Sequence, residues 1–170
     1  AANGTAAIVC FPGIMYRSGA EKKIRQYLID NGYVDCVIQL PGNLFFGTPI
    51  ATNILILRRG NPDSTTLFID ASKECVKVTN SNKLTQDNIE HIVQFFTERK
   101  EMPHVVHLAS YEEIVKQDYN LSVSSYVETE DVREKIDIVK LNEEIRNIVA
   151  REQALRDEID KIIAEIEVGV

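Results

Sequence analysis

Four short apolar runs separated by turn residues shape the first 70 residues of the chain. They lie at residues 5–11, 34–40, 52–57 and 66–69. Runs of this length that stop at Pro-Gly or Asn-Pro pairs predict β-strands. The first run has almost no polar position, which indicates a buried strand of a parallel sheet with both faces covered.

A helix is expected at residues 18–31, between the first two runs. Ser18 and Glu21 have the spacing of a capping box, and Asn31-Gly32 is a typical helix end. Three apolar residues recur at helical spacing and should form the buried face. They are Ile24, Tyr27 and Leu28.

The strand at 52–57 is expected to run antiparallel to its neighbours. Residues 41–51, which precede it, show no helical spacing. A parallel crossover needs about a dozen residues and usually contains a helix. The order strand, helix, strand, loop, strand therefore predicts the far half of a doubly wound α/β sheet.

Residues 71–83 are polar and are expected to form a loop. A helix at 85–100, stopped by Pro103, a short strand at 104–108 and a short helix at 110–116 capped by Ser110 should follow. The first of these helices should bury Ile89, Ile92, Val93 and Phe96.

The clearest periodic signal is a heptad pattern in the last 40 residues. From Asp131 to Glu167 there is no Gly or Pro, and only Glu152 interrupts nine positions spaced alternately by three and four. Such a helix would extend roughly 55 Å, more than the diameter of the preceding domain, so its apolar seam should meet a partner. The seam consists of Ile138, Leu141, Ile145, Ile148, Leu155, Ile159, Ile162 and Ile166.

Length and charge limit the number of domains and the classes of function that the chain can have. A chain of 170 residues suits one ordinary domain with an appendage, and its net charge of −7 argues against a free-standing DNA-binding protein. Residues 1–60 carry six Lys and Arg against three Asp and Glu, so phosphate contacts should come from this part. We expect three segments, 1–70, 71–130 and 131–170.

The rarer residue types indicate a cytoplasmic protein without a metal site. No apolar run is long enough for a membrane span, and no signal peptide precedes the first strand. Cysteines 10, 36 and 75 are odd in number and far apart, as expected of reduced thiols. Histidines 91, 104 and 107 have no cysteine or carboxylate at ligand spacing, and no catalytic constellation stands out.

Two blocks of sequence carry a family signature. The first spans residues 6–57 and includes VIQLPGNLFFGTPI at 37–50. The second spans 110–127 and includes SYEEI at 110–114 and DYNLS at 118–122. In order and spacing, both resemble the modification subunits of type I restriction–modification enzymes, which are adenine-N6 DNA methyltransferases.

The resemblance implies the fold and the cofactor. Residues 5–57 would supply the last parallel strand, a helix and the antiparallel hairpin of an S-adenosylmethionine-dependent methyltransferase sheet. Helices and a long, coiled-coil-like C-terminal helix would follow. The family's glycine-rich cofactor loop and its Asn-Pro-Pro-aromatic motif do not occur in the chain. They would lie upstream of Ala1, so the chain would be a C-terminal portion that neither binds S-adenosylmethionine nor methylates DNA alone.

The loop at 41–50 is the candidate site that remains. In related adenine methyltransferases this loop presents an aromatic ring to the extruded base, and Phe45 matches that position best, with Phe46 as its rival. Gly47 would allow close backbone approach. From the residues alone, both rings could equally belong to the core. Candidates for contact with the DNA backbone are Arg17, Lys22, Lys23 and Arg25, although they could form a solvated helix face, and Arg25 an internal ion pair.

The family also implies partners for the C-terminal helix. Its modification subunits assemble with a specificity subunit, which reads the DNA target, and with a restriction subunit. The heptad seam by itself indicates only a helical partner, which could be a second copy of the chain. The alternative function is a non-enzymatic α/β interaction module that oligomerises through this helix.

Overall fold

The chain forms two compact units, residues 1–130 and 131–170, which are described separately. The computed structural model describes residues 3–60, 65–129 and 138–168, and the side chains of the last helix through residue 164. Residues 71–129 belong to the same compact unit as the first strands.

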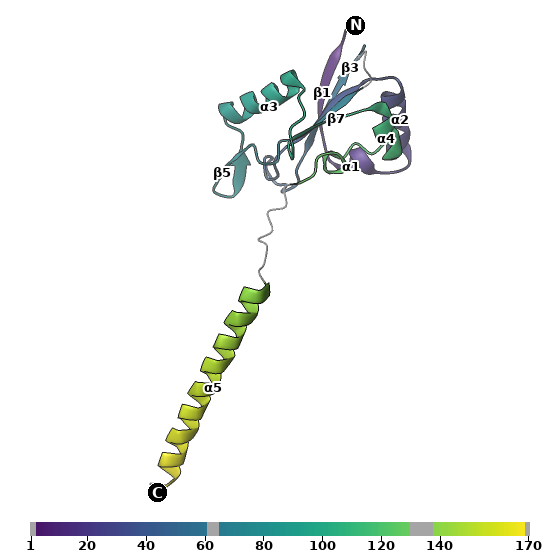
Figure 1. The fold of residues 1–170 in the computed structure, drawn as a ribbon. Helices are drawn as coiled ribbons and strands as arrows, with labels where there is room; N and C mark the ends of the chain where they lie inside the picture. Colours follow the sequence, from purple (N-terminus) through teal and green to yellow (C-terminus); the bar gives the residue numbers. More distant parts are fainter. Residues whose placement is uncertain (1–2, 61–64, 130–137, 169–170) are drawn as a thin grey trace. The chain divides into compact units, whose positions relative to one another are not determined.

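A five-stranded mixed sheet organises the first unit (Figure 1). Its spatial order is β1-β3-β2-β4-β7. β3 runs antiparallel to both β1 and β2, which confirms the orientation expected from the short connection before it. β2 and β4 are parallel, and β7 closes the other edge antiparallel to β4. The strands are β1 (Thr5–Cys10), β2 (Val34–Gln39), β3 (Asn53–Arg58), β4 (Thr66–Asp70) and β7 (Val106–Ala109).

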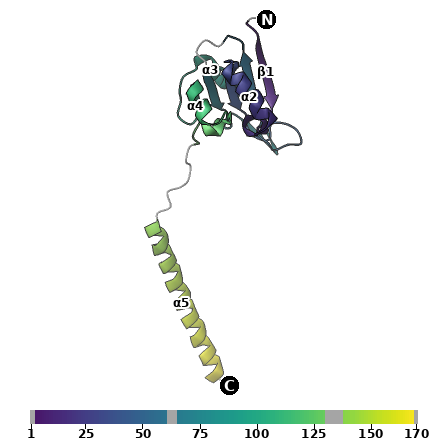
Figure 2. The ribbon, with the colours of Figure 1, turned by 90° about the vertical axis from the view of Figure 1, so that its right-hand side faces the viewer.

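Helices pack on both faces of this sheet (Figure 2). Alternate residues of β4 point to opposite faces, so Phe68 joins one core cluster while Leu67 and Ile69 join the other. The first cluster includes Met15, Ile29 and Ile114 from three helices, and the second includes Ile92. The helices are α1 (Gly13–Tyr16), α2 (Ala20–Asp30) and α4 (Tyr111–Lys116) on one face and α3 (Gln86–Glu98) on the other.

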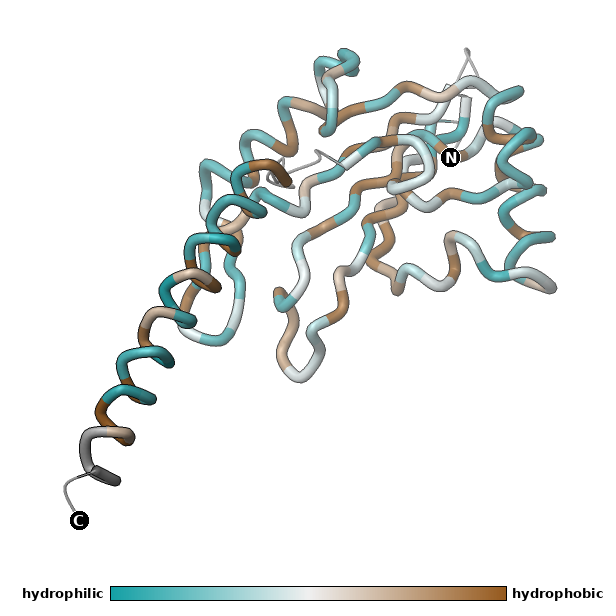
Figure 3. Tube along the Cα trace, turned by 60° about the horizontal axis from the view of Figure 1, so that its bottom comes forward, coloured by the Kyte–Doolittle hydropathy of each residue, from teal (hydrophilic) through white to brown (hydrophobic). Residues whose placement is uncertain are grey.

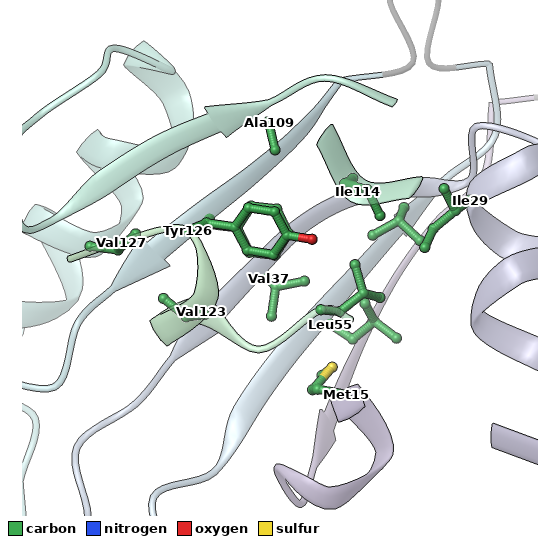
Figure 4. Close-up of a cluster of buried hydrophobic side chains, with 12 residues drawn as sticks. Met15, Ile29, Val37, Leu55, Ala109, Ile114, Val123, Tyr126 and Val127 are labelled. Atoms are coloured by element: carbon green, nitrogen blue, oxygen red, sulfur yellow. The ribbon is translucent and has the colours of Figure 1, made fainter. Parts of the chain in front are cut away.

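Tyr126 occupies the middle of the first cluster (Figure 4). Its ring stacks on that of Phe68 with centroids 3.9 Å apart, and its hydroxyl donates to the Asn120 carbonyl oxygen at 2.6 Å. The short 3-10 helix η1 (Val123–Ser125) precedes it. The segment after α4 is thereby fixed to the sheet.

The first strand differs from its expectation as a buried strand. β1 lies at the edge of the sheet, and Ile8 and Val9 are 47% and 56% exposed. Among the described residues, only β3 pairs with β1, and no second strand or helix layer encloses it. An apolar strand with an open edge is a site where further chain can pair.

The buried face of α2 also differs from the prediction. Arg25 and Ile29 point into the body, whereas Ile24 and Tyr27 are mostly exposed and Leu28 is half-buried. The helix is capped by Gly19 without a side-chain hydrogen bond, so the expected capping box of Ser18 is wrong. Arg25 explains which face is buried: its guanidinium group binds two carbonyl groups of the body, and these bonds turn the Arg25 side of the helix inward.

The segment 71–83 is a two-stranded ribbon, although a loop was expected. β5 (Val76–Val78) pairs antiparallel with β6 (Ser81–Lys83), and residues 79 and 80 form the turn. α3 follows with the predicted start, since Thr85 and Asn88 form a capping box. The helix ends at Glu98, before Pro103, because Arg99 adopts a left-handed conformation with φ of 49°. It buries Ile92, with Phe95 and Phe96 partly buried, and leaves Ile89 and Val93 exposed.

The second unit contains the predicted long helix, α5 (Ile138–Val168). Apolar segments recur along it (Figure 3), and its seam residues from Ile138 to Ile162 are exposed. The expected first turn at 131–137 and the side chain of Ile166 lie outside the described residues. Across the described ranges, no helix combines the length and apolarity that a membrane span requires.

Candidate functional site

The loop at residues 41–50 lies at the carboxyl edge of the parallel strands. β2 ends at Gln39 and β3 begins at Asn53, and these two residues are register partners. Cys10, the last residue of β1, pairs with Asn53 from the other side. The ends of three strands therefore meet beside this loop, which is where open α/β sheets bind ligands.

The two limbs of the loop are held close together at its base. The Asn43 N–H donates to the Pro49 carbonyl oxygen at 3.3 Å, and the Leu40 N–H donates to Thr52 at 2.8 Å. A Cβ atom on Gly42 would lie 2.8 Å from the Pro49 oxygen, so this approach requires glycine. The base of the loop is thus fixed while its tip extends from the sheet.

The tip presents both phenylalanines to solvent. Phe45 is 46% exposed and Phe46 is fully exposed. Neither ring is therefore a core residue, which removes one of the two readings that the sequence left open. Gly47 has φ of 78°, a conformation that glycine adopts without strain.

An open groove of about 760 Å³ separates the loop from the β5–β6 ribbon. Residues 43–49 line one wall and residues 78–81 line the other. The site predicted from the sequence lacks the second wall, because the polar composition of residues 71–83 predicts a loop and not a ribbon. The signal was the alternation of Val76, Lys77 and Val78 ahead of a Thr79-Asn80 turn.

The four basic candidates do not act as one surface. Arg17 and Lys23 are exposed, and Lys22 forms an ion pair with Asp118. Arg25 is buried, and its Nε and Nη1 donate to the carbonyl oxygens of Tyr119 and Ile14 at 2.8 and 2.7 Å. Arg25 is therefore an internal brace and not a DNA contact. Its partners are carbonyl groups, whereas the sequence suggested an ion pair.

His107 and Cys36 have surroundings that indicate a structural role and not a catalytic one. His107 lies between Glu113 and Glu101, at 2.8 and 3.2 Å. Burial raises the pKa of the Cys36 thiol, so this cysteine stays protonated and unreactive. Within the part of the chain that the structure describes, no three His, Cys, Asp or Glu residues are grouped as a metal site would need.

Comparison with known sequences identifies relatives of the chain. The N-6 DNA Methylase family profile matches residues 1–135. The type I restriction enzyme MpnII methylase subunit of Mycoplasma pneumoniae is 45% identical over 97% of this chain. The MjaVIII methylase subunit of Methanocaldococcus jannaschii is 36% identical over 84% of it. The chain spans 31% and 26% of these two relatives, about a third of their length or less.

Solved structures agree with the sequence comparison. The methyltransferase subunit of a type I restriction-modification system from Streptococcus thermophilus superposes with a TM-score of 0.73 at 43% identity. That match covers 75% of this chain and 27% of the other. The EcoKI M protein, at 15% identity and a TM-score of 0.59 over 93% of this chain and 41% of its own, shares the fold. The chain belongs to the N-6 DNA methylase family, and its similarity is to the methylase subunits of type I restriction enzymes.

Proposed function

We propose that this chain completes the catalytic sheet of an adenine-N6 DNA methyltransferase subunit and that its loop at 41–50 receives the target adenine. The observation that carries the proposal is the pair of exposed phenylalanines on an anchored loop at the carboxyl edge of the sheet. An enzyme that modifies an adenine must extrude it from the duplex. Stacking on an aromatic ring offsets part of that cost, by about 1–3 kcal/mol for each base.

Phe45 is the ring that we assign to the base. It is half-buried, so the protein supports part of the ring and leaves the rest free for a base. Phe46 is fully exposed, and ordering such a side chain on binding would cost conformational entropy. A ring that the protein already covers in part has less freedom to lose on binding, which makes Phe45 the better platform.

Replacing Phe45 with alanine in the whole methylase subunit should slow methyl transfer by about tenfold to a hundredfold, because base stacking is lost. The affinity for S-adenosylmethionine should stay unchanged. Radiolabelled methyl transfer to an oligonucleotide duplex and calorimetry measure the two quantities. Ile50→Ala is the matched control, since Ile50 is an equally exposed apolar residue of the same loop. Equal slowing in both variants would contradict the assignment.

The cofactor site is proposed to lie in the part of the relatives that this chain does not span. The chain contains no Gly-x-Gly arrangement and no Asn-Pro-Pro-aromatic motif. Calorimetric titration of the chain with S-adenosylmethionine should therefore give no binding heat, while a whole methylase subunit titrated in parallel should bind. Micromolar affinity of the chain alone would show that the cofactor site is here.

The exposed seam of α5 is proposed to dock onto the specificity subunit of a type I complex, which also includes a restriction subunit and DNA. Seven seam residues from Ile138 to Ile162 are exposed along one helix, as knobs-into-holes packing on another helix requires. For the chain alone, the same seam would support self-association. On the first unit, exposed Arg17 and Lys23 remain the candidates for contact with the DNA backbone.

A further inference from the structure

Asn82 of β6 joins the ribbon to the loop that carries Phe45. Its side-chain nitrogen Nδ2 donates to the Gly42 carbonyl oxygen at 2.7 Å. Its backbone N–H donates to the Asn43 carbonyl oxygen at 2.9 Å. Both acceptors lie in the limb that leads to Phe45, and two bonds from one residue fix the distance and the orientation of that limb.

The groove between the loop and the ribbon has walls without negative charge. Residues 41–50 and 76–83 contain none of the 26 Asp and Glu residues of this acidic chain. β5 and β6 instead contribute the exposed Lys77 and Lys83. A polyanion can therefore approach this groove without meeting a carboxylate on either wall.

The lining also matches the chemistry of a nucleotide. Phe45 and Val78 offer apolar surface from opposite walls, and Asn80 and Ser81 offer amide and hydroxyl groups at the ribbon's tip. A nucleobase presents an aromatic face and a hydrogen-bonding edge beside a phosphate. The groove provides a partner for each of these parts.

We propose that the β5–β6 ribbon is the second wall of the groove that receives the base and that Asn82 is the positioning residue that holds the Phe45 loop against it. The proposal rests on the function proposed above for that loop. Asn82 acts through the loop and does not touch the base, because its two bonds end at Gly42 and Asn43. A small displacement of the ring would misalign the stacked base and slow the reaction.

The test is Asn82→Asp in the whole methylase subunit assembled with its specificity subunit. Aspartate keeps the shape of asparagine but turns a carboxylate toward the Gly42 oxygen, so the loop should shift. Methyl transfer should fall about tenfold, while the affinity for S-adenosylmethionine and the Tm should match the control. The control is Asn31→Asp, which removes the same kind of bond, from Nδ2 to the Tyr27 carbonyl oxygen at 2.7 Å, at the end of α2.

A positioning role has a second signature that a purely structural role lacks. The double variant Asn82→Asp Phe45→Ala should be no slower than Phe45→Ala alone, because Asn82 acts only through the ring. Additive losses would overturn the proposal, as would an Asn82→Asp rate equal to that of Asn31→Asp. If Asn82→Asp lowers the Tm, Asn82→Ala is judged by the same comparisons. It removes the side-chain bond, lets water reach the Gly42 carbonyl oxygen and keeps the backbone bond to Asn43.

The variants also separate the two proposals. A slow Phe45→Ala enzyme with a normal Asn82→Asp enzyme would reject the role of the ribbon and keep that of the loop. A normal rate for Phe45→Ala would reject both.

Discussion

Replacing Arg25 with methionine should lower the free energy of unfolding of the chain by about 3 kcal/mol, the largest effect expected for a single side chain away from the apolar core. Methionine keeps the length of the aliphatic stem but has no donor. The carbonyl groups of Ile14 and Tyr119 would lose their charged partner and would have no replacement in the buried site. Urea unfolding followed by circular dichroism measures the change.

The matched control is Lys23→Met on the exposed side of the same helix. It removes one positive charge and adds the same apolar side chain, so it should change stability by less than about 0.5 kcal/mol. Arg25→Lys should be nearly as damaging as methionine, because an ammonium group cannot reproduce the guanidinium fork between two carbonyl groups. Similar midpoints for the variants at positions 23 and 25 would refute the role of Arg25 as a brace.

With the seam of α5 docking as proposed, replacing Ile159 and Ile162 with aspartate should weaken assembly of the whole methylase subunit with a specificity subunit by at least about a hundredfold. The reason is that desolvating even one unpaired carboxylate costs several kcal/mol. Both residues lie in the exposed seam of α5. Analytical ultracentrifugation of the mixed subunits, with the chain alone as a second sample, measures complex formation and self-association separately.

Ala150→Asp with Ala164→Asp is the control for this pair. Both alanines are exposed positions of α5 that lie opposite the seam in the heptad pattern, and the substitutions add the same charge. This control should assemble normally. Normal assembly of the Ile159 and Ile162 variant would remove the seam from the interface, and equal weakening of both variants would indicate loss of the helix itself.

The elements that depend on local pattern could be predicted from the sequence. The strands at 34–40, 52–57 and 66–69, the cap at Ser110 and the long helix all carry their signal within a few neighbouring residues. The face of α2 does not, because Arg25 turns inward toward a carbonyl group 94 residues away, at Tyr119. The environment of β1 has no local signal either, since an apolar run has the same sequence pattern whether or not another strand lies beside it.

The candidate site was half predictable for the same reason. The loop at 41–50 lies in the block that resembles type I modification subunits, and this resemblance is what named Phe45 and Phe46 as candidates. The exposure of those rings required the structure. The opposite wall comes from a short, polar ribbon of weak strand propensity, and Asn82 gains its place only because folding brings it to Gly42, 40 residues earlier in the chain.

The anchoring of the loop at 41–50 determines which of its residues can be replaced. The bonds at its base are made by backbone groups of residues 40, 42, 43, 49 and 52 together with Asn82. The side chains of residues 45–47 contribute to none of them. Residues at the tip can therefore be replaced while the base of the loop stays fixed. A library that randomises residues 45 and 46 should retain folded proteins at high frequency, whereas one that randomises Gly42 should not, because any Cβ there meets the Pro49 oxygen. If the loop receives a base as proposed, its affinity for that base can change through residues 45 and 46 without compensating changes in the sheet.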